Sequence, residues 1–250
     1  MRLIADVHGA TAALRRLAAD PSPLLILGDL INYIDYRTYE GLVADIAGTE
    51  FVAQLVSLRL HREPDLARAH WEHFVAGREE EIRSRFDAAV EIAYQDVGAA
   101  LTGATAFVTY GNVDRPELLA GHLPPGSRFV DGDVVEIEGW QVGFAGGGVM
   151  ALNTPGEVPD DAMADKLDSL GRVDVLCTHV PPAVPSLASD VIGGRSKASL
   201  PVFDYIERFQ PAFHYFGDVH QPQALSWRIG RTVCRNVGYF RATGRPVIHR

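Results

Sequence analysis

Short apolar runs that stop abruptly at glycine and polar residues recur along this chain. Residues 24–27 are four consecutive aliphatic side chains, and Gly28-Asp29 follow them at once. Uninterrupted runs of this length are typical of parallel strands buried on both faces. Residues 2–5 form a similar run, and apolar residues at helical spacing in 10–19 predict a helix between the two. A strand–helix–strand unit therefore opens the chain and indicates an α/β fold.

The strand pattern returns in the second half of the chain. Apolar runs predict strands at 105–110, 173–177 and 212–216, and two hairpins that turn at Gly139 and Gly230. Residues 35–101 differ, because their apolar residues follow helical spacing with almost no strand signal. We expect one domain over residues 1–250 with 35–101 as a helical insertion. The insertion either packs against the domain or serves as a lid or dimer surface, so the alternatives include a homo-oligomer.

Five predicted strands end in polar side chains of the kind that bind metals. These endings are Asp6-Val7-His8, Gly28-Asp29, Gly111-Asn112, Thr178-His179 and Asp218-Val219-His220. Ligands of open α/β sheets bind beyond the carboxyl ends of the strands, so we expect the five endings to converge on one rim. Asp6 and His8 are two residues apart, as are Asp218 and His220. In an extended chain that spacing directs both side chains to one side, so we expect the two members of each pair to bind at the same site.

The donor atoms predict a transition-metal centre. Carboxylate and amide oxygens combined with imidazole suit Mn, Fe, Zn, Co or Ni better than Mg or Ca. Seven candidate ligands are too many for one tetrahedral ion, whereas two ions that share a carboxylate accommodate them, as in known phosphate-ester hydrolases. The candidates are Asp6, His8, Asp29, Asn112, His179, Asp218 and His220. The two cysteines, Cys177 and Cys234, predict neither a disulfide framework nor a thiolate zinc site.

The order DxH, GD, GN, H and GxH resembles the calcineurin-like metallophosphoesterase superfamily, and the GNxD form of the third motif is similar to its small bacterial branch. The resemblance implies a two-sheet β-sandwich flanked by helices. It also implies hydrolysis of a phosphate ester, as a phosphodiesterase or phosphatase, by a water or hydroxide shared between two divalent ions. Manganese is the ion we expect first. Residue by residue, the resemblance implies one ion on Asp6, His8 and His220, a second on Asn112, His179 and Asp218, and Asp29 as the bridge.

Two positions depart from the family pattern. Val113 stands where the family has a histidine that assists the leaving group, which favours phosphodiesters or other esters with good leaving groups. Asp218 stands where the family has a metal-binding histidine. A carboxylate at that position either favours a harder ion or leaves the second metal site weak.

Several further residues are candidates for roles in catalysis. We expect Asp29, Asn112, Asp114 and Arg115 to act in the reaction, with the Arg115 guanidinium holding a phosphate oxygen. A surface position at a helix start is the alternative for Arg115. Asn32 and His122 are candidates for substrate binding, because Asn32 follows the Gly28-Asp29 motif and His122 lies near the third motif in sequence.

Charge and hydropathy narrow the classes of partner. With 32 acidic against 23 basic side chains the net charge is -9, which disfavours nucleic acid and anionic lipid, so a nuclease ranks low. The N-terminus does not resemble a signal peptide, and no apolar stretch approaches the roughly 20 residues of a membrane helix, so we expect a cytoplasmic protein. A catalytically weakened scaffold that binds a protein partner is the main alternative. Every ligand position keeps a metal-competent residue, which favours an enzyme acting on a small phosphate ester.

Overall fold

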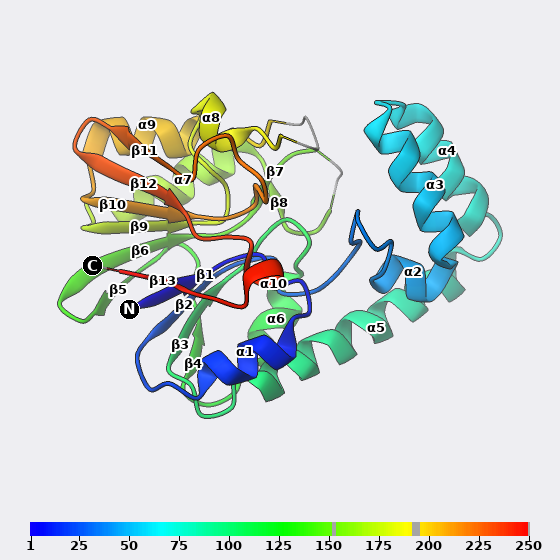
Figure 1. The fold of residues 1–250 in the computed structure, drawn as a ribbon, viewed down its shortest axis with the longest axis horizontal. Coiled ribbons are helices and arrows are strands. Elements are labelled where there is room, and N and C mark those ends of the chain that lie inside the picture. Colours follow the sequence, from blue (N-terminus) through cyan, green and yellow to red (C-terminus); the bar gives the residue numbers. More distant parts are fainter. Residues whose placement is uncertain (152–153, 192–195, 250) are drawn as a thin grey trace. The chain divides into compact units, whose positions relative to one another are not determined.

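The computed structural model describes residues 1–151, 154–191 and 196–249 and divides into two compact units (Figure 1). The larger unit holds Met1–Leu30 and Asp96–Arg250, and the smaller holds Ile31–Gln95. The smaller unit coincides with most of the region in which the sequence predicts a helical insertion. All the candidate site residues except Asn32 belong to the larger unit.

The first sheet of the larger unit has five strands. In spatial order they are β13 (Val247–Ile248), β1 (Arg2–Ile4), β2 (Leu24–Leu27), β3 (Ala106–Thr109) and β4 (Ser127–Phe129). The strands β1 to β4 run parallel, and β13 pairs antiparallel with β1 at the edge. Every residue of β1 and β2 is buried, as expected for parallel strands covered on both faces.

The second sheet has six strands. In spatial order they are β11 (Ser226–Ile229), β12 (Thr232–Asn236), β10 (Phe213–Phe216), β9 (Val175–Thr178), β6 (Trp140–Ala145) and β5 (Asp133–Ile137). The four inner strands run parallel, and the antiparallel edge strands β5 and β11 belong to the two hairpins predicted from the sequence. Gly139 and Gly230 make the hairpin turns with φ of 84° and 56°. A separate small sheet pairs β7 (Gly148–Val149) with β8 (Glu157–Val158).

The two large sheets pack face to face, and helices flank them (Figure 1). Leu25 and Leu27 of β2 share one buried cluster with Phe144 and Val175 of the second sheet. A second cluster packs the other face of that sheet against α7 (Asp160–Leu170), α8 (Pro185–Ala188) and α9 (Leu200–Phe209). Beside the first sheet lie α1 (Thr11–Ala18) and α6 (Pro116–His122). The architecture is therefore α/β, with two mixed sheets flanked by helices, as the sequence predicts at this level.

The smaller unit is helical. It contains α2 (Leu42–Ala47), α3 (Thr49–Leu60), α4 (Pro64–Val75) and the greater part of α5 (Glu79–Ala100), and no strand is described between Leu27 and Ala106. Aromatic side chains hold these helices together. The Phe51 ring lies 4.1 Å from the His70 ring and 4.8 Å from the Phe74 ring. No helix in the described part of the chain combines the length and hydropathy needed to cross a membrane.

Candidate metal centre

The predicted ligands sit in loops that leave neighbouring strands of the larger unit, and backbone hydrogen bonds tie these loops together. After β1 and β2, the amide of Asp6 donates to the carbonyl of Gly28 over 3.1 Å, and that of His8 donates to the carbonyl of Asp29 over 2.8 Å. After β9 and β10, the amide of Gly217 donates to the carbonyl of His179 over 2.9 Å. The parallel register of each sheet thus continues one or two residues into the loops that carry the ligands.

Four of the predicted ligands have left-handed backbone conformations. The φ angles are 59° for Asp6, 40° for His8, 55° for Asp29 and 66° for Asp218. Residues other than glycine seldom adopt such angles, and strain of this kind clusters at functional sites. Neither pair therefore has the extended backbone that the sequence analysis expects. Asp6 and His8 do meet at one group of ligands, but through these backbone turns, whereas Asp218 and His220 face different groups.

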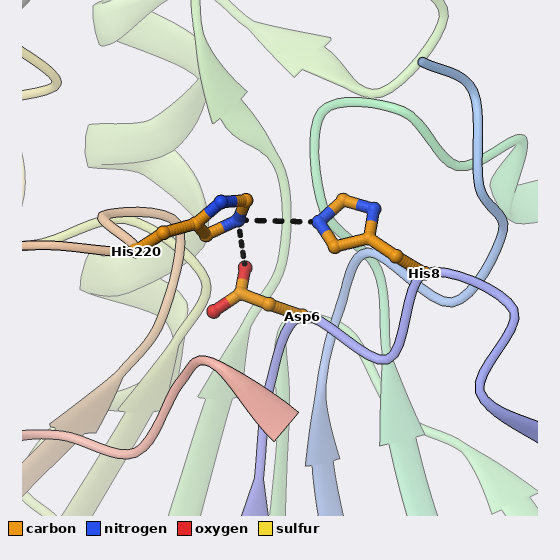
Figure 2. A group of neighbouring side chains, drawn as sticks. All are labelled: Asp6, His8 and His220. Atoms are coloured by element: carbon orange, nitrogen blue, oxygen red, sulfur yellow. Dashed lines mark hydrogen bonds and ion pairs between the residues drawn. The ribbon is translucent and has the colours of Figure 1, made fainter. Parts of the chain in front are cut away.

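The first group of ligands contains Asp6, His8 and His220 (Figure 2). The Nε2 atoms of His8 and His220 lie 3.2 Å apart, and His220 Nε2 lies 3.6 Å from Asp6 Oδ1. Figure 2 shows both imidazole edges and the carboxylate directed toward one point. Two nitrogens and a carboxylate oxygen at such spacing form one face of a metal coordination sphere.

Tyr239 packs against two members of this first group, and no sequence motif selects it. Its ring stacks on His220 with centroids 4.1 Å apart and planes 8° apart, and it meets the His8 ring edge-on at 5.9 Å. Arg241 adds a bond from Nη1 to the carbonyl of His8 over 2.5 Å. The available signal was the predicted strand at 232–237, which is also followed by a glycine, but the next residue is an aromatic rather than a ligand.

Asp29 lies between two histidines in a second group that contains Asp6, Asp29 and His179. Its Oδ2 is 3.5 Å from His8 Nε2, and its Oδ1 is 3.4 Å from His179 Nε2. His179 Nδ1 donates to the carbonyl of Leu27 over 2.7 Å, which directs Nε2 toward the carboxylates. A metal-binding histidine commonly has its second nitrogen fixed in this way.

The charges in the second group are strongly coupled. Burial by itself raises the pKa of Asp29, but His179 and His8 outweigh it and hold that pKa well below its usual range. Burial lowers the pKa of His179, but Asp29 and Asp218 outweigh it and raise that pKa well above the usual range. The negative field of the carboxylates thus favours a positive charge at this point.

Three buried polar atoms of the predicted ligands lack a hydrogen-bond partner in the described part of the chain. Asp6 Oδ2, Asn112 Oδ1 and His179 Nε2 form no hydrogen bond with any residue that the structure describes. An unpaired buried polar atom costs about 1–3 kcal/mol, so a fold seldom keeps three together without a ligand. A carboxylate oxygen, an amide oxygen and an imidazole nitrogen are the donors that a divalent transition metal takes, and the residues present fit such an ion.

Close backbone packing fixes the Gly111-Asn112 loop. A Cβ on Gly111 would overlap Asp29 Oδ1 and lie 2.6 Å from His179 Nε2, so only glycine fits beside these two ligands. A Cβ on Gly148 would overlap the Asn112 side chain, and Thr154 Oγ1 donates to the Asn112 carbonyl over 2.6 Å. The absence of a side chain at Gly148 thus allows its backbone to approach Asn112 closely.

Asp114 is fully buried and binds two backbone amides. Its Oδ1 accepts from the amide of Leu30 over 3.0 Å, and its Oδ2 accepts from the amide of Gly111 over 2.9 Å. Burial, together with the charge of Asp29, raises its pKa to about 7. Asp114 therefore joins the Asp29 loop to the Asn112 loop, which makes it a positioning residue.

Lys197 contacts the last predicted ligand, and the sequence motifs did not reveal it. Its Nζ donates to the Asp218 carbonyl over 2.8 Å and also to Asp218 Oδ1, which lies 3.6 Å from His179 Nε2. Burial by itself raises the pKa of Asp218, but Lys197 and His179 outweigh it, and that pKa is lowered. A lysine in a loop 21 residues before Asp218 carries no recognisable spacing signal.

The remaining candidates lie outside the two groups. Arg115 occupies the residue before α6, and its carbonyl accepts from Leu119 over 2.9 Å. His122 ends α6, and its Nδ1 pairs with the carbonyl of Leu118 over 2.8 Å. Asn32 belongs to the smaller unit, where its carbonyl accepts from Leu42 over 2.9 Å.

Comparison with known proteins supports the fold. No protein-family model and no curated protein sequence matches the chain. A solved crystal structure is similar to it with a TM-score of 0.58 over 96% of this chain and 90% of that chain, at 15% sequence identity. A likeness at that level of identity supports the arrangement of sheets and helices and carries no information on the chemistry.

Proposed function

We propose that this chain is a metal-dependent phosphoesterase with the calcineurin-like metallophosphoesterase fold, and that it hydrolyses a small phosphate ester. One observation carries the proposal. The Asp29 carboxylate lies between His8 and His179, and each oxygen is within 3.5 Å of a different imidazole. Such a carboxylate can serve two adjacent cation positions, which is the arrangement that phosphate-ester hydrolysis uses.

The residues divide between these two positions. Asp6, His8 and His220 would hold a divalent ion at the first position, and His179 and Asp218 border the second. Asn112 would be a further ligand at the second position. When bound, a divalent ion lowers the pKa of a coordinated water and neutralises phosphoryl oxygens. Manganese, iron, zinc, cobalt and nickel all suit these donors, and manganese is the first to test.

The protein side chains favour attack by water over a covalent route. Cys177 lies close in sequence to His179, but its side chain is fully buried and burial raises the pKa of its thiol above the usual range. A buried, protonated thiol is a poor nucleophile. The centre therefore supplies ligands and charge, and the substrate's phosphorus is attacked by water.

Val113 shapes the range of substrates. Its amide donates to Asp29 Oδ1 over 3.2 Å, so the residue helps to position the bridge but brings no acid to the leaving group. General acid catalysis typically contributes 10²–10⁴-fold, and a leaving group of low pKa needs little of it. Phosphodiesters with aryl leaving groups are the substrates that this site suits best.

Metal removal and replacement test the proposal. Protein treated with a chelator should fail to hydrolyse bis(p-nitrophenyl) phosphate, and added Mn²⁺ should restore the reaction in the native protein but not in Asp6→Asn. Native protein that binds no metal and shows no hydrolysis would favour a scaffold that binds a protein partner.

A further inference from the structure

The positively charged side chain of Lys197 pairs with the Asp218 carboxylate, which borders the second cation position. Lys197 Nζ bonds to both the carbonyl and the carboxylate of Asp218. The Asp218 side chain is 2% exposed, whereas that of Lys197 is 32% exposed. The lysine therefore reaches from the surface to a buried ligand, and its charge also acts on Asp29 and Asp6.

Backbone contacts on both sides of Lys197 fix the point from which its side chain extends. The amide of Lys197 donates to the carbonyl of Ala188 over 2.8 Å, and Ser196 forms a bridge with Ser189. Two residues later, the amide of Ser199 donates to the carbonyl of Pro181 over 3.1 Å. These contacts hold the backbone of Lys197 between two anchored points.

The residue type also matters. The chain has 23 lysines and arginines, and only Lys166 and Lys197 among them are lysines. An ammonium group is a compact point charge with three donors, whereas a guanidinium is a planar fork. An ammonium can occupy the space of a small cation among oxygen ligands, which a guanidinium cannot do.

A second divalent ion would compete with this ammonium. It would lie next to His179, and the nearby Asp218 Oδ1, 3.6 Å from His179 Nε2, already accepts from Lys197. An ion on that oxygen would lie within a few ångströms of a like charge inside a mostly buried site, where such repulsion is poorly screened. The first position is formed instead by one carboxylate and two imidazoles, those of Asp6, His8 and His220.

We propose that the centre binds a single divalent ion, on Asp6, His8, His220 and Asp29, and that the Lys197 ammonium takes the place of the second ion at Asp218. This departs from the two ions expected from the sequence, and it rests on the proposed function. Lys197 would then supply the fixed positive charge that a phosphoryl oxygen meets on the Asp218 side of the site.

Metal counting on the full chain tests this assignment. Native protein and the variants Lys197→Met and Lys197→Gln are dialysed against Mn²⁺, their bound manganese is measured, and their electron paramagnetic resonance spectra are recorded. Lys166→Met is the matched control, because Lys166 is a partly buried lysine that pairs with Asp131 over 2.9 Å. Melting temperatures establish that each variant is folded.

The native protein and Lys166→Met should bind a single manganese ion with an uncoupled spectrum. At least one folded Lys197 variant should bind two ions and show a spin-coupled pair. Two ions in the native protein, or a single ion in both Lys197 variants, would overturn the assignment and leave the phosphoesterase proposal standing. A native protein without bound manganese would instead overturn the phosphoesterase proposal.

Discussion

Tyr239 stacks face to face on His220, with ring centroids 4.1 Å apart and planes 8° apart. The stack fixes the orientation of a histidine whose side chain is 31% exposed and would otherwise turn in solvent. Groups that orient a ligand commonly affect metal affinity by 10–100-fold. Tyr239 therefore acts on the centre through His220.

Replacement of Tyr239 should separate stacking from hydrogen bonding. Tyr239→Ala should weaken Mn²⁺ binding by about 10-fold or more, whereas Tyr239→Phe keeps the ring and should bind nearly as well as the native protein. Calorimetric titration with Mn²⁺ measures both. Equal affinity in Tyr239→Ala and the native protein would show that His220 needs no such support.

The histidines of the smaller unit should not contribute to metal content. His70 stacks on Phe51 at 4.1 Å, and His73 is exposed on the same helix. The double variant His70→Ala/His73→Ala should lose the stack and melt at a lower temperature, while its manganese content stays at the native value. A fall in manganese content in the folded variant would assign metal ligands to α4.

His214 should make the fold sensitive to acid. Thr178 Oγ1 donates to the carbonyl of Val180 and lies 2.8 Å from His214 Nε2, so Nε2 carries the proton and donates to Thr178. Nδ1 then carries a lone pair that accepts no hydrogen bond from residues 1–151, 154–191 and 196–249. Burial lowers the pKa of His214 to about 3, because protonation would bury an unpaired charge.

The sign of the effect follows from that shift. The unfolded chain takes up a proton near pH 6.5 and the folded chain only near pH 3, so stability falls as the pH falls between these values. Between pH 7 and pH 5 the loss should be about 2 kcal/mol of unfolding free energy. His214→Gln should lack this part of the pH dependence in urea titrations. An unchanged slope in the variant would show that another group titrates.

Substrate preference should follow leaving-group acidity. Three substrates are compared: bis(p-nitrophenyl) phosphate, p-nitrophenyl phosphate and a simple alkyl phosphate monoester. With Val113 in place of an acid, bis(p-nitrophenyl) phosphate should react fastest and the alkyl monoester slowest. Steady-state rates with Mn²⁺ present make the comparison. An alkyl monoester as the best substrate would require an efficient acid, and His122 would be the first residue to replace.

The sequence predicted those parts of the fold that have continuous apolar runs, helical spacing of apolar residues or glycine turns. The inner strands, both hairpins and the helical region before Ala106 were all expected. The short strands β4 and β13 were missed, because two of the three residues in Ser127–Phe129 are polar and Val247–Ile248 has only two residues. Their pairing depends on neighbouring strands rather than on their own composition.

The residues of the candidate site were likewise predicted only where a sequence pattern marks them. Residues at strand ends were found because strand direction brings distant sequence segments to one rim. Tyr239 and Lys197 were missed, since each reaches the centre through a side-chain contact that has no fixed sequence spacing. The left-handed turns at Asp6 and Asp218 were missed as well, because tertiary contacts impose them on residues that seldom adopt them.

The central claim is that Asp29 joins the two cation positions of a centre that hydrolyses phosphate esters, and Asp29→Asn tests it most directly. Manganese content and turnover of bis(p-nitrophenyl) phosphate are measured together for the native protein, Asp29→Asn, Asp218→His and Asp131→Asn, which removes a carboxylate that pairs with Lys166. The native protein and Asp131→Asn should bind manganese and hydrolyse the ester. Asp29→Asn should lose metal and at least 10²-fold in turnover, a greater loss than that of Asp218→His. Near-native turnover in Asp29→Asn would contradict the account.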